Sequence, residues 1–109
     1  MTPAKADYSP VRRGDTIPAR TVTVSQDGAP LDLSLIDVES DFLLGRKRVQ
    51  LRVGSGITKT NAAAGQFRID DLKLLQAGVW SYDLQLVYTD GVVRTLLYGQ
   101  IEVVEDVTK

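Results

Sequence analysis

The strongest constraint on this fold is a strict alternation of apolar and polar residues near the end of the chain. In VWSYDLQLVY, residues 79–88, every second side chain is large and apolar or aromatic: Trp80, Tyr82, Leu84, Leu86 and Tyr88. A period of two is typical of a β-strand with one buried face. Asp90-Gly91 follows, a strong signal for a tight hairpin turn, and residues 92–104 return. The sequence therefore predicts a long antiparallel hairpin.

The register of this hairpin follows from its turn. With a two-residue turn at Asp90-Gly91, these pairs face one another: Tyr88 with Val93, Leu86 with Thr95, Leu84 with Leu97, Tyr82 with Gly99, and Trp80 with Ile101. A glycine weakens a strand unless an aromatic side chain lies over it, as Tyr82 would over Gly99. The expected structural core and corner comprise Gly78, Trp80, Tyr82, Leu84, Gly99 and Ile101.

A second hairpin is predicted over residues 35–53. One face of its first strand carries Leu35, Asp37, Glu39 and Asp41, and the other carries Ile36, Val38 and Phe42. With a turn at Leu44-Gly45, the facing pairs are Asp41 with Arg48, Glu39 with Gln50, Asp37 with Arg52, Val38 with Leu51, and Ile36 with Val53. Opposite charges across a strand pair are favourable, and one register satisfies both faces.

The rest of the chain also favours short strands. Residues 16–26 alternate, residues 66–70 place Phe67 and Ile69 on one face, and Asp27-Gly28 is a turn signal. Residues 54–65 are expected to form a long flexible connection with a short extended piece over 57–60, and residues 71–78 a helical turn or an irregular corner. About seven short strands without a long helix predict an antiparallel β-sandwich. We expect one domain over residues 11–109, preceded by a loose polar arm over residues 1–10.

Composition removes several classes of function. The 109 residues contain neither cysteine nor histidine, so disulfides, thiolate nucleophiles, the usual general base and the commonest metal ligands are missing. A net charge of -1 argues against a general nucleic-acid binder. No apolar run approaches the roughly 18 residues of a membrane span, and the N-terminus lacks the apolar centre of a signal peptide. The expectation is folding in a cytosol, without a metal, cofactor, nucleic-acid or membrane partner.

The tripeptide Arg13-Gly14-Asp15 admits two interpretations. It matches an extracellular integrin ligand, but that function requires export. The structural interpretation is a turn that leads from the arm into the first core strand. Gly14 would supply backbone freedom and Asp15 a local side-chain hydrogen bond. The absence of export signals favours the turn.

Residues 75–82, LQAGVWSY, resemble a corner found in immunoglobulin-like sandwiches. Those domains often place a tyrosine near the start of the sixth strand, two residues before the second cysteine of the core disulfide. Here Trp80 stands at the corner position and Tyr82 at the cysteine position. The resemblance implies an immunoglobulin-like fold without the disulfide.

A broader resemblance covers about 95 residues, through RRGDTIP, DGAPLDLS, AGQFRIDD and LLQAGVWSYDLQLVYTDGVVRTLLYGQIEVVEDVT. This order of segments is similar to the immunoglobulin-like domain at the N-terminus of phage baseplate upper proteins, and to small tail-associated phage virion proteins. The chain departs from the family pattern at Trp80, where that family has tyrosine. The resemblance implies a virion protein made in the host cytoplasm, surrounded by other virion proteins and repeated, as a homo-oligomer or a ring.

Other candidate sites have simpler structural interpretations. Asp37, Glu39 and Asp41 could serve acid–base catalysis or bind calcium. The basic cluster of Arg46, Lys47, Arg48 and Arg52 could bind phosphate or nucleic acid. The two groups face one another in the predicted register, which favours a neutralised, solvated face. Residues 54–65 lack the Gly-Lys-Ser/Thr sequence that ends a phosphate-binding loop. The remaining interpretations of this segment are a connection between strands and a contact in an assembly. Trp80 and Tyr82 could stack on a sugar, but their alternation with leucines favours the core.

The face of the last hairpin opposite Trp80 is unusually apolar for a solvated strand face. Its residues form the candidate interface: Val79, Val87, Val92, Leu96 and Tyr98. Either the N-terminal arm covers this face or it packs on a neighbouring molecule, since contiguous apolar surface marks contact sites. We expect a non-enzymatic virion structural protein, an assembly or adaptor module of tail, baseplate or neck. The alternatives are a carbohydrate- or host-surface-binding module and a capsid decoration protein.

Overall fold

The computed structural model describes residues 4–105. It contains these elements: β1 (Ala4–Lys5), β2 (Val11–Arg12), β3 (Arg20–Thr23), β4 (Ser25–Gln26), β5 (Ala29–Pro30), β6 (Asp37–Leu44), β7 (Lys47–Val53), β8 (Gly56–Asn61), the 3-10 turn η1 (Ala62–Ala64), β9 (Gln66–Ile69), β10 (Gly78–Val87) and β11 (Val93–Val104). The predicted all-β class is confirmed, because the described residues fold almost wholly as strands and the turns between them.

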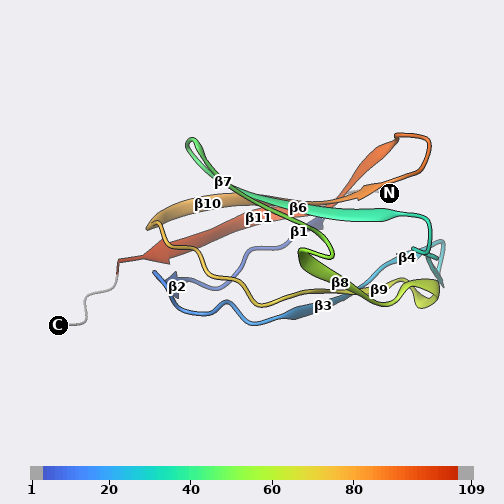
Figure 1. The fold of residues 1–109 in the computed structure, drawn as a ribbon, viewed down its shortest axis with the longest axis horizontal. Helices are drawn as coiled ribbons and strands as arrows, with labels where there is room; N and C mark the ends of the chain where they lie inside the picture. Colours follow the sequence, from blue (N-terminus) through green and yellow to red (C-terminus); the bar gives the residue numbers. More distant parts are fainter. Residues whose placement is uncertain (1–3, 106–109) are drawn as a thin grey trace.

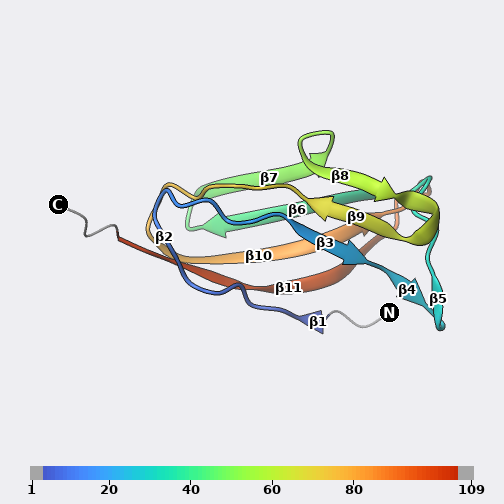
Figure 2. The same ribbon diagram turned by 90° about the horizontal axis from the view of Figure 1, so that it is seen from below.

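The strands form two layers of an elongated sandwich (Figures 1 and 2). One layer contains β11, β10, β6 and β7, and the other contains β8, β9 and β3; the layers join where β7 pairs with β8. The chain passes between layers before β6, between β7 and β8, and between β9 and β10, as expected for an immunoglobulin-like sandwich. The pairs β1–β11, β2–β11 and β7–β8 are parallel, so the sheet is mixed rather than wholly antiparallel.

The core lies between the layers and follows the alternation of the sequence. Phe42, Phe67, Leu84 and Ile101 are among its fully buried side chains. Trp80 and Tyr82 are also buried, at 3% and 5% exposure, as their alternation with leucines predicts. Side chains on the opposite face of β6 and β10 are exposed or half-buried, because successive residues of a strand point to opposite faces.

The register of β10 and β11 agrees with the prediction over its first half only. Trp80 pairs with Ile101, Tyr82 with Gly99 and Leu84 with Leu97, but Leu86 pairs with Arg94 and Val87 with Val93. The connecting loop has three residues, since Tyr88 N–H donates to Val92 O at 2.9 Å. That extra residue shifts the register by one, and a bulge after Leu84 shifts it back. The predicted pairs Leu86–Thr95 and Tyr88–Val93 are therefore wrong.

The predicted register of β6 and β7 is wrong by two residues. Leu44 pairs with Lys47, Asp41 with Gln50 and Glu39 with Arg52, because the turn lies at Gly45-Arg46. A shift of two keeps every side chain on its predicted face. Asp41 and Arg48 become diagonal neighbours and still form an ion pair at 3.0 Å.

One connecting segment differs from expectation in part, and one agrees with it. Residues 54–65 contain η1 and β8, which includes the extended piece expected over 57–60. They do not form a long flexible connection, because Ile57 is fully buried and Ile57 and Thr58 pair with β9. Residues 70–77 form the irregular corner, tied to the chain by a bridge between Ile17 and Leu72. Asp27 and Gly28 both have positive φ, 54° and 80°, and form the predicted turn.

Candidate interaction surfaces

The N-terminal segment is docked along β11 and does not form the loose arm that its polar sequence suggests. Ala6 N–H donates to Tyr98 O at 2.8 Å and Tyr8 N–H to Gln100 O at 3.0 Å. The hydroxyl of Tyr82 donates to the carbonyl oxygen of Ala6. This correction applies to residues 4–10; residues 1–3 lie outside the described part of the chain.

An aromatic cluster anchors this segment to the core. The ring of Tyr8 packs edge-on against Tyr82 at 4.9 Å between centroids and against Phe42 at 5.9 Å. Tyr82 stacks on Phe42 at 5.4 Å, and the guanidinium of Arg20 lies 4.5 Å from the Tyr8 ring centre. Burial raises the pKa of both tyrosines, although the charge of Arg20 opposes the shift.

Trp80 closes the corner that the sequence resemblance suggests. Its Nε1–H donates to the carbonyl oxygen of Gln76 at 2.9 Å, which is the backward hydrogen bond that a corner tyrosine makes in related folds. Gly78 permits this turn: its φ is 142°, and a Cβ there would lie 2.9 Å from a methyl carbon of Leu44. The burial of Trp80 and Tyr82 leaves neither ring free to stack on a sugar.

The Arg-Gly-Asp tripeptide forms the predicted turn. Gly14 has φ 84°, and Asp15 N–H donates to Arg12 O at 3.1 Å. Arg13 lies 3.8 Å from Glu105 in an exposed ion pair. Within residues 4–105 no side-chain hydrogen bond of Asp15 is found, so that detail of the prediction is wrong.

The candidate interface residues do not form one continuous patch. Val79, Val92 and Tyr98 are exposed, at 50%, 42% and 45%, whereas Val87 is half-buried and Leu96 packs partly on the core. Val79 and Val87 lie at opposite ends of β10 with Ser81, Asp83 and Gln85 between them on the same face. The centre of this outer face therefore carries the polar residues of β10 beside Tyr98 of β11, which pairs with Asp83, and its valines lie toward its two ends. The N-terminal segment runs beside β11 and leaves Val79 exposed.

Asp83 occupies the polar centre, directly opposite Asp41 of β6. Burial raises the pKa of Asp83, and the neighbouring charge of Asp41 raises it further. Its Oδ1 is buried without a hydrogen-bond partner among the described residues. Alternation marks Asp83 as a polar residue of the outer face but does not predict that its carboxylate is partly buried.

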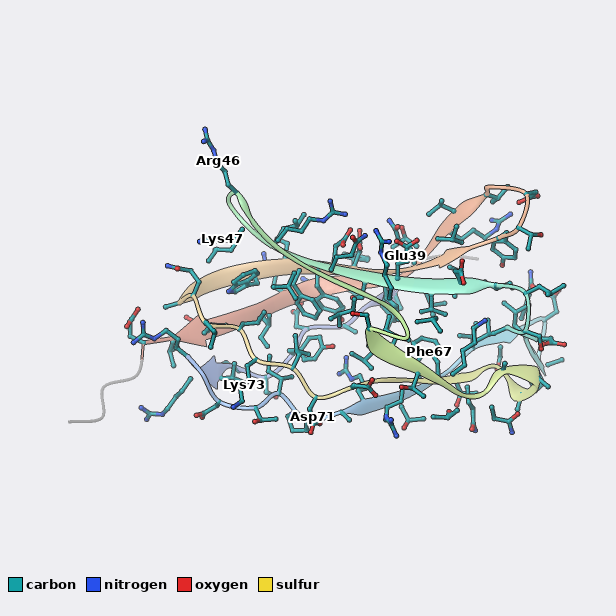
Figure 3. All side chains as sticks on the ribbon, in the orientation of Figure 1. Glu39, Arg46, Lys47, Phe67, Asp71 and Lys73 are labelled. Carbon is teal, nitrogen blue, oxygen red and sulfur yellow. The ribbon has the colours of Figure 1, made fainter. Side chains whose placement is uncertain are left out.

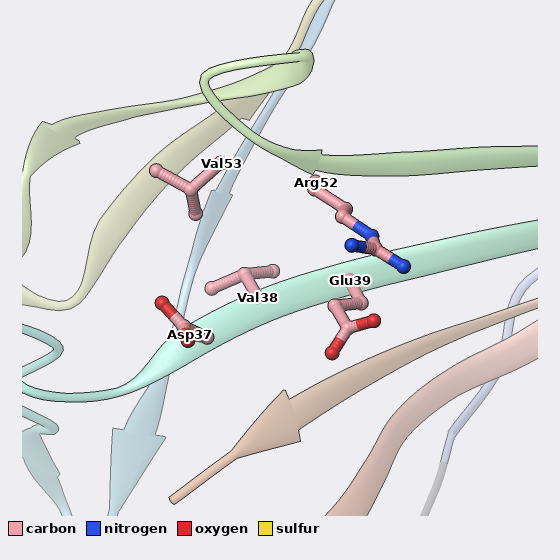
Figure 4. Close-up of a pocket in the computed structure, with 5 residues that line it drawn as sticks. All are labelled: Asp37, Val38, Glu39, Arg52 and Val53. Atoms are coloured by element: carbon pink, nitrogen blue, oxygen red, sulfur yellow. The ribbon is translucent and has the colours of Figure 1, made fainter. Parts of the chain in front are cut away.

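The acidic residues of β6 form a hydrogen-bonded network with β7. Asp41 pairs with Arg48 at 3.0 Å, and Gln50 Nε2 donates to Glu39 Oε1 at 3.3 Å. Asp37, Glu39 and Arg52 line a hollow of about 180 Å³ together with Val38 and Val53 (Figure 4). This volume lies below the ~300–1,000 Å³ of typical ligand pockets. Within residues 4–105 no group of three acidic side chains is placed to hold a metal ion.

The ends of the sandwich carry exposed basic and apolar side chains that lie outside the predicted interface. Arg46 and Lys47 project at the β6–β7 turn, and Lys73 lies on the β9–β10 connection (Figure 3). Leu75 near these cations is 71% exposed, and Leu35 at the far end is 79% exposed. Leu35 shares its predicted face with three carboxylates, which was the available signal that it would point into solvent.

No protein-family model and no curated protein sequence matches this chain. Within residues 4–105 no helix has the length and apolar character needed to cross a membrane. The resemblance to the phage domains therefore remains a prediction from sequence.

Proposed function

We propose that this protein is a non-enzymatic structural component of a phage virion, an assembly or adaptor module of tail, baseplate or neck. Its partners are other virion proteins and further copies of itself, and its mechanism is surface complementarity. The observation that carries the binding role is the exposure of large apolar side chains at both ends of the sandwich. These are Leu43, Leu75 and Val79 at one end, and Leu35, Val92 and Val93 at the other.

The rigidity of the sandwich supports this role. The longest dimension is 49 Å, and the docked segment 4–10 seals the edge of β11 by backbone pairing. A covered edge prevents strand addition at β11, which supports contacts made at the hairpin ends. Apolar side chains held at fixed positions on such a block favour specific protein contacts. The phage setting rests on the sequence resemblance alone.

Mass spectrometry of purified phage particles from a strain that carries this gene tests the proposal. We expect the chain in the particles in several copies, and we expect gene deletion to yield particles arrested in assembly or unable to infect. Recovery of the chain only in the soluble fraction, with unchanged infectivity after deletion, would contradict a structural role.

A further inference from the structure

The two ends of the sandwich have opposite charge. Around the β6–β7 turn and the β9–β10 connection lie Arg46, Lys47, Arg48 and Lys73, and around the opposite end lie Asp27, Asp32, Asp37 and Asp90. Asp71, Glu102 and Glu105 at the first end, and Arg52, Lys59 and Arg94 at the second, offset part of this difference. The net charge of -1 is therefore distributed unevenly, with a basic end and an acidic end along the long axis.

The basic end contains an apolar hollow. Val49, Leu75 and Trp80 contribute its apolar lining, and Lys47, Arg48 and Lys73 contribute its basic residues; its volume is about 270 Å³. Arg48 is held by Asp41 at 3.0 Å. None of the ion pairs found among residues 4–105 involves Lys47 or Lys73. The hollow suits an apolar side chain with acidic neighbours.

The acidic end presents such a side chain. Leu35 is 79% exposed, while its neighbours Leu33 and Ile36 are buried at 0% and 8%. Ile36 N–H donates to Leu33 O at 3.1 Å, and Asp32 accepts a hydrogen bond from Ser34 N–H at 2.9 Å. Leu35 is therefore fixed in an outward position, because both flanking residues are anchored in the core.

We propose that Leu35 of one copy inserts into the hollow of a second copy, with Asp32 and Asp37 beside Lys47 and Lys73. β6 begins at Asp37 beside the acidic end, and the β6–β7 hairpin runs to the basic end (Figure 1), so one chain cannot satisfy its own contact. The contact is heterologous, head to tail, and each added copy leaves one free hollow and one free Leu35. Such contacts build closed rings or open filaments.

Sedimentation velocity on the purified protein tests this contact. We expect species larger than a dimer that dissociate as salt rises, because screening weakens exposed charge pairs. Leu35→Lys places a cation against Lys47 and Lys73 of the second copy, and Leu75→Glu places a carboxylate against Asp32 and Asp37. Each is expected to weaken association about tenfold or more, whereas Thr21→Glu, at an exposed position of β3, leaves association unchanged.

A mixture of the two variants gives the decisive result. Leu35→Lys retains an intact hollow and Leu75→Glu retains an intact Leu35, so an equimolar mixture can form one unaltered interface and is expected to stop at a heterodimer. Unfolded variants could not restore association. A monomeric parent protein, an equal loss in Thr21→Glu, or a mixture without heterodimers would overturn the proposal.

This inference deepens the proposed function, because it identifies the second copy and the contact. Its failure is distinguishable from failure of that function. If the chain associates head to tail but is absent from particles, only the virion role is contradicted. If the chain is monomeric but is found in particles, only the head-to-tail contact is contradicted.

Discussion

Gly99 lies directly opposite Tyr82 in the β10–β11 ladder, and the N-terminal segment occupies the space beside it. A Cβ at Gly99 would lie 2.5 Å from Ala6 O. The absent side chain therefore allows the backbone of the segment to approach β11. The same tyrosine also donates its hydroxyl proton to Ala6 O.

Gly99→Ala is expected to destabilise the fold by about 1–3 kcal/mol, because the new methyl group overlaps the backbone of Ala6. Alanine in place of glycine would otherwise strengthen a strand interior. Urea unfolding measures the difference, and Ser81→Ala, at an exposed position of the same hairpin, should change stability by less than about 0.5 kcal/mol. A Gly99→Ala protein as stable as the parent would refute the close approach.

The two tyrosines of the aromatic cluster should respond differently to removal of the hydroxyl. Tyr82→Phe loses the hydrogen bond to Ala6 and should cost about 1 kcal/mol of unfolding free energy. The Tyr8 hydroxyl is buried without a hydrogen-bond partner among the described residues. Tyr8→Phe should therefore be neutral or slightly stabilising. Denaturant unfolding of both variants checks the contrast, and equal losses would contradict it.

Trp80 is the single tryptophan and reports directly on the core. Because it is 3% exposed, its fluorescence should be weakly quenched by acrylamide or iodide in the folded protein and strongly quenched after unfolding. Added glycans should not change it. Strong quenching of the folded protein would show that the indole is accessible and would revive the carbohydrate-platform hypothesis.

Asp83 predicts a pH dependence of stability. Its pKa is raised by burial and by Asp41, so the folded state binds this proton more tightly than the unfolded state. The protonated Asp83 side chain therefore contributes to the free energy of unfolding. This contribution is complete below the pKa of the unfolded state, about 3.9, and is lost as pH rises through the higher pKa of the folded state. Asp83→Asn should thus stabilise the protein at pH 7, and the gain should shrink toward pH 3.

Asp32 provides the matched control of opposite sign. Hydrogen bonds from Ser34 lower the pKa of Asp32. The ionised Asp32 side chain therefore contributes to the free energy of unfolding above the pKa of the unfolded state, and this contribution is lost as pH falls through the lower pKa of the folded state. Asp32→Asn should destabilise the protein at pH 7. Thermal unfolding between pH 3 and pH 7 compares the variants, and shifts of the same sign in both would contradict the assignment.

The sequence was informative where alternation and turn signals agreed. The strand faces of β6, β7 and β10 follow from a period of two, and burial of Trp80 and Tyr82 follows from that alternation. The registers failed near the turns, because a three-residue loop and the bulge after Leu84 depend on backbone geometry that alternation does not encode. The docked segment was missed because its attachment uses mainly backbone groups and the ring of Tyr8.

The candidate surfaces were harder to predict for a related reason. Alternation places Val79 and Val87 on the same face of one strand. They lie near opposite ends of β10, a strand of 10 residues, and are therefore about 26 Å apart at ~3.3 Å per residue. Leu75 lies in an irregular segment, where no period assigns a face. Lys73 of the β9–β10 connection lies beside Lys47 at the start of β7 only because the fold brings these segments together.

Electron cryomicroscopy of purified particles tests the central claim most directly. Density for this sandwich is expected in repeated copies, with its two hairpin ends against neighbouring protein chains. Particles without such density, or copies whose two ends both face solvent, would contradict an assembly role carried by the ends of the sandwich.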